Sequence, residues 1–106
     1  WYLTPRGWAE RTEAYLDGAG ELFVAAAGRA LEAAGCRAAD VDAVVTISST
    51  GIATPSLEGR VAGRLGLRPD VRRVPLFGLG CAGGVQGLAL ADRLARADPG
   101  ATVLLV

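Results

Sequence analysis

The 106-residue sequence contains no histidine, no lysine and no methionine. Its two cysteines, Cys36 and Cys81, lie far apart, and two distant thiols without a histidine form no recognisable metal-binding pattern. We therefore expect no metal site. Eleven arginines balance eleven aspartates and glutamates, so the formal net charge is zero. Because a basic excess and a basic tail are both absent, we expect no nucleic-acid partner.

Signals for secretion and for membrane insertion are also missing. No leader with a charged start, an apolar run and a small-residue cleavage site opens the chain, so we expect a cytoplasmic protein. The longest uncharged stretch, 74–91, approaches the roughly 20 residues of a membrane-spanning helix. Pro75, Gln86 and five glycines interrupt it, and we expect a buried strand, turn and helix there instead.

The two ends of the sequence predict a fragment. The first residue is not methionine, and the chain stops at Val106 inside an apolar run. We expect residues 1–106 to belong to a longer domain.

Helical spacing is present in several regions. The region 8–16 is polar with Trp8, Tyr15 and Leu16 as anchors, which is consistent with a short helix. Apolar residues recur three and four positions apart in 21–34 and in 85–97, and Leu57, Val61 and Leu65 form the apolar stripe of a third helix between them. Gly35 is placed to end the second helix, and Gly66 the third. Thr54 is expected as the N-cap of the third helix, with Pro55 as its first residue. The region 85–97 is apolar over most of its circumference, as expected of a buried helix.

Strands are predicted between these helices. The β-branched run 41–48 is typical of a strand buried on both faces of a sheet, and 72–77 and 101–106 are two further strands. Helices and strands alternate along the chain, so we expect an α/β fold with a mainly parallel βαβαβ sheet and right-handed crossovers.

A glycine-dense turn, Gly78–Gly84, lies between the strand 72–77 and the last helix. It places Cys81 at or just before the N-terminus of that helix, where unpaired N–H groups and the positive end of the helix dipole favour a thiolate. Its glycines allow backbone or substrate to come close. Cys81 is therefore the candidate nucleophile, whereas Cys36 follows a helix end with nothing nearby to activate it and is interpreted as structural.

The same turn has a second interpretation. Gly78, Gly80 and Gly83 match the G-x-G-x-x-G pattern, in which helix N–H groups bind the pyrophosphate of a dinucleotide. That site needs an acidic residue at the end of the next strand, and Asp98 comes before that strand. A nucleotide-binding module remains an alternative at this point.

Polar residues near the other loops also allow two interpretations. Ser48–Gly51 follows the first strand, and the carboxyl ends of parallel strands carry ligand-binding loops, so its hydroxyl groups are candidates for lining a site. The alternative is a turn that hydrogen-bonds to itself. Arg60, Arg64 and Arg68 lie near one helix face and either bind a phosphate or form a solvated surface, of which the second is favoured.

Three motifs together resemble one family. The segments Ser48–Pro55 (SSTGIATP), Gly66–Pro69 (GLRP) and Arg73–Gly84 (RVPLFGLGCAGG) are similar to those of the bacterial branch of type III polyketide synthases. These are the chalcone-synthase-like enzymes of the thiolase fold. The resemblance covers the region from about Gly7 to Val106.

The resemblance implies roles for individual residues. Cys81 would accept the acyl group, and its backbone N–H would form part of an oxyanion hole. Ser49 would line the initiation and elongation cavity, and Thr54 would reach across a homodimer interface. Thr50 and Gly80 complete the expected substrate-binding set. The histidine and asparagine of the family lie in its C-terminal half, so residues 1–106 would be a fragment of the N-terminal condensing-enzyme domain.

The resemblance also implies an activity. We expect decarboxylative Claisen condensation of malonyl-coenzyme A units onto an acyl-coenzyme A starter, with an acyl-cysteine intermediate and no cofactor beyond these thioester substrates. The alternatives are a single-condensation enzyme of the ketoacyl synthase III type and, less favoured, the nucleotide-binding module. The resemblance implies that the fragment alone is inactive.

Overall fold

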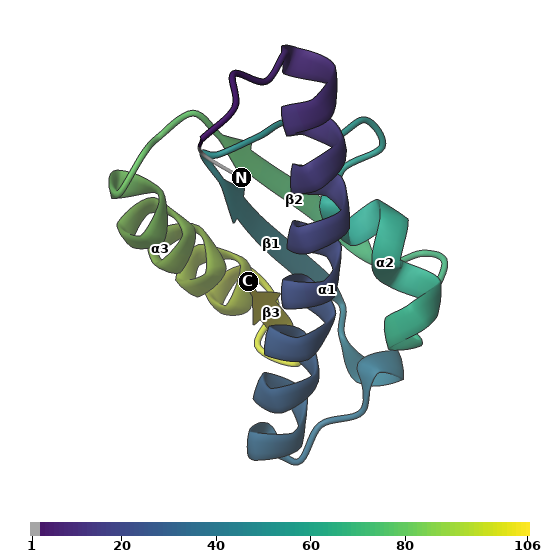
Figure 1. Cartoon of the computed structure of the whole chain (residues 1–106). Helices are drawn as coiled ribbons and strands as arrows, with labels where there is room; N and C mark the ends of the chain where they lie inside the picture. Colours follow the sequence, from purple (N-terminus) through teal and green to yellow (C-terminus); the bar gives the residue numbers. More distant parts are fainter. Residues whose placement is uncertain (1–2) are drawn as a thin grey trace.

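The computed structural model describes residues 3–106 and shows an α/β fold (Figure 1). Its elements follow in the order α1 (Trp8–Ala34), the 3-10 helix η1 (Ala38–Asp40), β1 (Ala43–Ser48), α2 (Leu57–Leu65), β2 (Arg72–Phe77), α3 (Ala82–Ala97) and β3 (Val103–Leu105). The expected alternation of helices and strands is confirmed. The strand 72–77 has the predicted bounds, whereas β1 and β3 are each shorter than 41–48 and 101–106.

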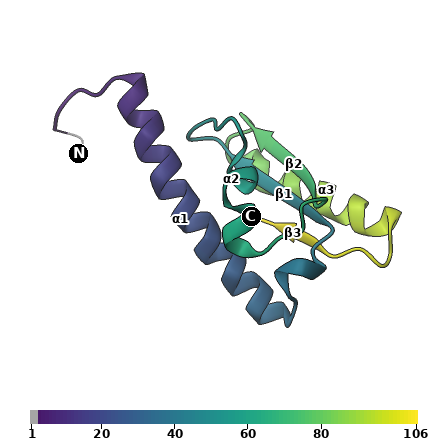
Figure 2. The same ribbon diagram turned by 90° about the vertical axis from the view of Figure 1, so that its right-hand side faces the viewer.

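The sheet is parallel, with the strand order β2-β1-β3. In its register Val44 of β1 lies opposite Arg73 of β2 and Leu104 of β3. Helices α1 and α2 cover one face, and α3 covers the other (Figures 1 and 2). The carboxyl ends of β1 and β2 therefore lie side by side, and the loops that follow them meet at one edge of the sheet.

The hydrophobic core lies between β1 and the two helices α1 and α2. Its members are buried hydrophobic residues that contact one another across these elements and the loops between them. They are Phe23, Ala27, Leu31, Val41, Val44, Leu57, Val61, Leu67, Val71 and Leu104. Residues four apart lie on one side of a helix, and alternate strand residues share one face of a sheet. The hydrophobic spacing of the sequence therefore determines which face of each element is buried.

Helix α1 is one continuous helix, and the expected division into 8–16 and 21–34 is wrong. The segment 17–20 contains two glycines, which favour a break by intrinsic propensity. Gly20 is buried instead, and a Cβ added there would lie 3.8 Å from Val61 Cγ1. Packing of α1 on α2 thus outweighs the local preference. Gly35 has φ 64° and ends the helix as predicted.

Helix α2 begins later than expected. Ser56 is its N-cap, and Leu57 is its first residue, so the assignments of Thr54 as N-cap and Pro55 as first helical residue are wrong. The Thr54–Pro55 peptide is cis, and both residues belong to the loop before the helix. Ser56 is also a residue type that favours the N-cap position. Gly66, with φ 77°, ends α2 as predicted.

Helix α3 packs closely on the sheet through glycines. It starts at Ala82, directly after Cys81 as predicted, and Gly83 and Gly87 are its buried residues. A Cβ on Gly83 would lie 2.6 Å from Ile47 Cγ2, so glycine is what allows the helix to approach β1. On the other side of α3, Val85 is 71% exposed and Leu88 is 63% exposed. One face of α3 is thus buried, while its second apolar face is open among the described residues.

Within residues 3–106, none of the helices combines the length and the apolar character needed to cross a bilayer.

Candidate active site

Cys81 lies where the sequence predicts it, at the N-terminus of α3. It is the N-cap residue, it is exposed, and its thiol is free. The turn before it reverses the chain after β2, with φ 82° at Gly78 and φ 54° at Gly80. Side chains rarely adopt these left-handed conformations, so glycine is needed at both positions to place Cys81 at the helix end.

The start of α3 gives the thiol a suitable electrostatic setting. The first N–H groups of a helix have no partner within it, and the helix dipole is positive there. The Gly83 N–H donates to the Gly80 carbonyl at 3.0 Å, which closes the turn against the first helical residues. Such an arrangement supplies donors for a developing oxyanion.

The loop after β1 contacts the Cys81 turn directly. The Gly78 N–H donates to the Ser48 carbonyl at 3.3 Å, and Ser49 Oγ donates to the Gly80 carbonyl at 3.4 Å. The structure thus brings Ser49 and Gly80, two of the predicted site residues, next to the candidate nucleophile. The self-bonded turn is present as well, since Ser48 Oγ donates to the Gly51 carbonyl at 2.9 Å.

Thr50 and Thr54 lie further along the same loop. Both residues are exposed, and no hydrogen bond among the described residues joins either of them to the Cys81 turn. The Thr54 carbonyl accepts a hydrogen bond from Arg60 Nη2 at 3.0 Å. Thr50 borders a surface hollow beside Tyr15 and Leu22 of α1. The structure therefore brings these two threonines to the same edge as Cys81, without a hydrogen bond to its turn among the described residues.

A cavity of about 260 Å³ lies beneath this loop, against the ends of β1 and β2. Its lining includes Thr46, Ser48, Glu58 and Phe77. Thr46 Oγ1 and Glu58 Oε2 are buried, and neither has a hydrogen-bond partner among the described residues. Burial of an unpaired polar group is costly, so these two oxygens are energetically unfavourable features of the protein beside the cavity.

Sequence reasoning missed the burial of Glu58, which is 0% exposed. An acidic residue in the first turn of a helix is ordinarily explained by the helix dipole alone. The available signal is its spacing: Glu58 precedes Val61 by three positions, and residues three apart share a helix face. Ser56 Oγ donates to Glu58 Oε1, which anchors the carboxylate at the start of α2.

The three arginines near α2 each have protein partners. Arg60 donates to the carbonyls of Pro55 and Thr54, and Arg64 forms an ion pair with Glu21 at 2.8 Å. Arg68 pairs with Asp42 at 3.0 Å and with Asp70 at 3.1 Å. The interpretation as a phosphate site therefore gains no support.

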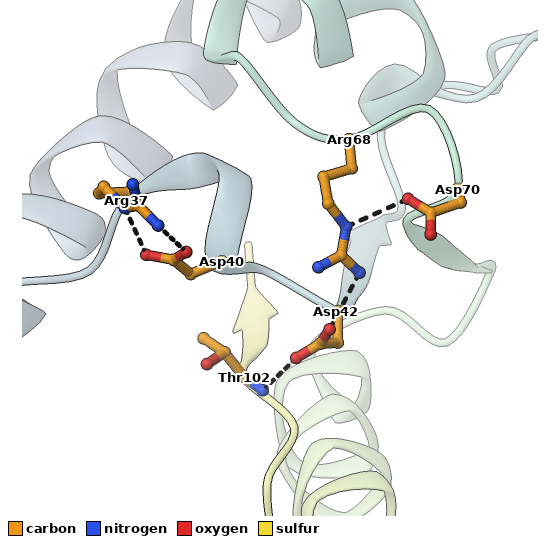
Figure 3. A network of polar contacts seen from close by, with 6 residues as sticks. All are labelled: Arg37, Asp40, Asp42, Arg68, Asp70 and Thr102. Carbon is orange, nitrogen blue, oxygen red and sulfur yellow. Dashed lines mark hydrogen bonds and ion pairs between the residues drawn. The ribbon is translucent and has the colours of Figure 1, made fainter.

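Arg68 and its two partners, Asp42 and Asp70, form a polar network at the opposite edge of the sheet, which we call the Arg68 network (Figure 3). Asp42 precedes β1, and its Oδ2 accepts a hydrogen bond at 2.9 Å from the N–H of Thr102, which precedes β3. This backbone hydrogen bond and then the Arg68 guanidinium hold the pKa of Asp42 below its ordinary value. The network joins the amino ends of the strands, far from the edge that carries Cys81.

Cys36 has none of the features of the Cys81 site. It is half-buried after the end of α1, and its thiol lies 3.6 Å from the Ala34 carbonyl. In the part of the chain that the structure describes, no group of three or more histidine, cysteine, aspartate or glutamate side chains is arranged to hold a metal ion. Asp98 is the C-cap of α3 rather than the end of the next strand, so the dinucleotide interpretation lacks its acidic residue.

Comparison with protein families identifies the segment. Residues 6–106 match the family described as "Chalcone and stilbene synthases, N-terminal domain". Over 77 residues the chain is 51% identical to a 1,3,6,8-tetrahydroxynaphthalene synthase of Streptomyces peucetius. This aligned region covers 73% of this chain and 20% of that protein. A putative chalcone synthase of Bacillus subtilis is 48% identical over 66 residues, or 62% of this chain and 18% of that protein.

Solved structures show the same similarity. The 1,3,6,8-tetrahydroxynaphthalene synthase of Streptomyces coelicolor, a bacterial type III polyketide synthase, superimposes with a TM-score of 0.92 at 31% identity, over 97% of this chain and 30% of that one. Germicidin synthase of Streptomyces coelicolor superimposes with a TM-score of 0.86 at 40% identity, over 91% of this chain and 25% of that one. The chain thus spans about a fifth to a third of the length of these relatives.

Proposed function

This chain belongs to the family of chalcone and stilbene synthases, as part of its N-terminal domain, and on that premise we propose that it carries the nucleophile of a type III polyketide synthase. The reaction is the decarboxylative Claisen condensation of malonyl-coenzyme A units onto an acyl-coenzyme A starter. The observation that carries the proposal is the position of Cys81, exposed as the N-cap of α3 on the glycine turn.

Two chemical steps use this position. The Cys81 thiolate attacks the carbonyl carbon of the starter thioester, a carbon–sulfur bond forms, and coenzyme A leaves as its thiolate. A malonyl unit then loses carbon dioxide, and the resulting carbanion attacks the acyl-cysteine carbonyl, so that a carbon–carbon bond forms and Cys81 is released. In both steps the Cys81 backbone N–H stabilises the oxyanion on the attacked carbonyl.

The remaining site residues surround the acyl group in this proposal. Ser49 and Gly80, which lie beside Cys81, line the cavity in which the chain grows. Thr50 and Thr54 contact substrate from the rim of the same loop, and Thr54 does so across a homodimer interface. The histidine and asparagine that assist decarboxylation in the family come from outside these 106 residues, because the sequence contains neither residue type.

The proposal extends to the surroundings of the enzyme. The thioester substrates supply the reactive carbonyl groups, so the reaction uses no further cofactor. The homodimer acts in the cytoplasm, where coenzyme A thioesters are available.

Mass spectrometry of the intact protein after incubation with an acyl-coenzyme A tests the nucleophile. We expect an acyl adduct on the peptide that contains Cys81 and none in the Cys81→Ala variant. Cys36→Ala serves as the control and should acylate normally. An adduct on another residue, or binding of a nicotinamide dinucleotide without acylation, would contradict the proposal.

A second measurement tests the number of condensations. With radiolabelled malonyl-coenzyme A, a type III polyketide synthase should release products that contain two or more malonyl-derived units. Products with one unit would instead identify the single-condensation enzyme of the ketoacyl synthase III type.

A further inference from the structure

Tyr15 connects α1 to the loop beside Cys81. Its hydroxyl oxygen lies 2.6 Å from Ser48 Oγ, although the two residues are 33 positions apart in the sequence. Ser48 Oγ donates its proton to the Gly51 carbonyl, and a serine hydroxyl has one proton to donate. Tyr15 is therefore the donor, and its hydroxyl fixes the serine in the orientation that closes the loop.

Ser48 also holds the turn on the other side. Its side chain faces Tyr15 and Gly51, while its carbonyl accepts the Gly78 N–H. The next residue, Ser49, donates to the Gly80 carbonyl. Ser48, the last residue of β1, and Ser49, which follows it, thus contact the two glycines whose left-handed conformations set the position of Cys81.

The tyrosine ring adds a packing contact to the hydrogen bond. A Cβ built on Gly51 would lie 2.5 Å from Tyr15 Cγ and 2.6 Å from Cδ1, so the ring rests against the loop backbone. Tyr15 is half-buried, and it borders the cavity that Thr46 and Glu58 also line. The ring and the hydroxyl therefore hold the loop at two separate points.

We propose that Tyr15 is a positioning residue for Cys81, acting through Ser48 and the loop 48–51 on the turn Gly78–Gly80. Among the described residues no hydrogen bond joins Tyr15 to the thiol or to its turn, so the hydrogen-bonded route from Tyr15 to Cys81 runs through Ser48 and Ser49. This proposal deepens the proposed function. It rests on that function only for the experiments that measure condensation. It is independent of that function where the chemical reactivity of Cys81 is measured.

The Tyr15→Phe variant of the intact protein tests the proposal, since it removes the hydroxyl and keeps the ring. Iodoacetamide is the probe, and the readout is the alkylation rate of Cys81 divided by that of Cys36 in the same sample. We expect this ratio to fall about threefold to tenfold, the range that one uncharged hydrogen bond is worth. Thr12→Ala, which removes an exposed hydroxyl from the same helix, should leave the ratio unchanged.

Variants of Ser48 identify the route. Ser48→Ala should lower the ratio as Tyr15→Phe does, and the double variant should be no worse than the more affected single variant, because both act on one chain of contacts. Ser48→Thr keeps a hydroxyl and should restore most of the ratio. Additive effects, or a Tyr15→Phe ratio equal to that of Thr12→Ala, would overturn the proposal.

Kinetics separate this proposal from the proposed function. For malonyl-coenzyme A condensation, Tyr15→Phe should lower kcat by a similar factor with little change in KM, since a displaced nucleophile affects the chemical step. If the unchanged protein condenses nothing while the Cys81 ratio still falls in Tyr15→Phe, the proposed function fails and the positioning role stands. A raised KM with an unchanged kcat and an unchanged Cys81 alkylation ratio would instead assign Tyr15 to substrate binding and overturn the positioning role.

Discussion

Cys81 and Cys36 differ in the two properties that control the reactivity of a thiol, which are exposure and local electrostatics. Cys81 is exposed at the start of α3, whereas Cys36 is half-buried after the end of α1. Cys81 lies at the positive end of the α3 dipole, whereas Cys36 follows the carbonyl groups at the end of α1. The structure therefore predicts a selective reaction of one cysteine in a protein that has two.

Alkylation with iodoacetamide at mildly acidic pH should label Cys81 at least about tenfold faster than Cys36. Peptide mass spectrometry after short reaction times measures both rates in one sample. Unfolding in urea should remove most of the difference, because it depends on the helix end and on burial. Equal rates in the folded protein would argue against the nucleophile assignment.

At the scale of elements, the contact of α3 with the sheet depends on two glycines. A Cβ on Gly87 would clash with Ile47 and lie 3.0 Å from Leu105 Cδ1. Gly87→Ala should lower the free energy of unfolding by about 1–3 kcal/mol, as expected for overpacking, despite the better helix propensity of alanine. Thermal or urea denaturation measures the change. Ile47→Val, which removes the clashing methyl group, should restore part of the loss.

The matched control for Gly87→Ala is another helical glycine. A Cβ on Gly28 of α1 would have no neighbour within 4 Å, so Gly28→Ala should stabilise the protein by up to about 1 kcal/mol. The free energy of unfolding should therefore rise in Gly28→Ala and fall in Gly87→Ala. If Gly87→Ala also stabilises, the close approach of α3 to β1 is incorrect.

The Arg68 network also acts between elements, because Asp42 links the starts of β1 and β3 by its hydrogen bond to the Thr102 N–H. A carboxylate whose pKa is lowered on folding stabilises the protein above its ordinary pKa, and this contribution disappears as the pH falls through the lowered value. Asp42→Asn should therefore lower Tm at pH 7, and the difference from the unchanged protein should shrink on acidification below about pH 4. Differential scanning calorimetry at several pH values measures it.

Asp70→Asn is the control for that experiment. Asp70 is 76% exposed and contacts Arg68 alone among the described residues, and an exposed ion pair contributes little. Its Tm should change less than that of Asp42→Asn at every pH. A difference for Asp42→Asn that persists unchanged at pH 3 would assign the effect to something other than the charge.

Local signals and distant contacts explain which elements were predictable. Gly35 and Gly66 end helices because a left-handed residue is needed there, and such a requirement is visible within a few residues. The continuity of α1 depends on the packing of Gly20 against Val61, a contact between distant segments. Propensity cannot include that contact, so the sequence predicted a break that does not exist.

The same distinction applies to the site. The position of Cys81 follows from a strand, a glycine turn and a helix in direct succession, and it was predictable. Tyr15 approaches Ser48 only once α1 has packed beside β1, and no spacing within the sequence indicates it. The start of α2 was wrong because Thr54 and Ser56 are both good N-cap residues, and the choice between them depends on the Thr54–Pro55 loop.

At the scale of the whole molecule, several large apolar side chains on α3 and near the Cys81 turn are exposed. Val85 and Leu88 of α3 are mostly exposed, and Phe77 and Leu79 are exposed close to the Cys81 turn. Exposed apolar groups that gather on one side of a protein are typical of surfaces covered by other protein. The strands β2 and β3 also form the two edges of the sheet and offer unpaired backbone groups.

We therefore expect residues 1–106, produced alone, to self-associate and to release no polyketide product, because the chain contains no histidine to assist malonyl decarboxylation. Size-exclusion chromatography with light scattering and a radiolabelled malonyl-coenzyme A assay measure the two properties. Replacing Val85 and Leu88 by glutamine should shift the population toward monomer, whereas Arg93→Gln, an exposed polar change on the same helix, should not. Slow acylation of Cys81 should persist in all of these variants, since the glycine turn and the helix N-terminus that position the thiol are built within the chain. A monomer that forms polyketide product would refute both the role of the α3 surface and the need for residues outside this chain.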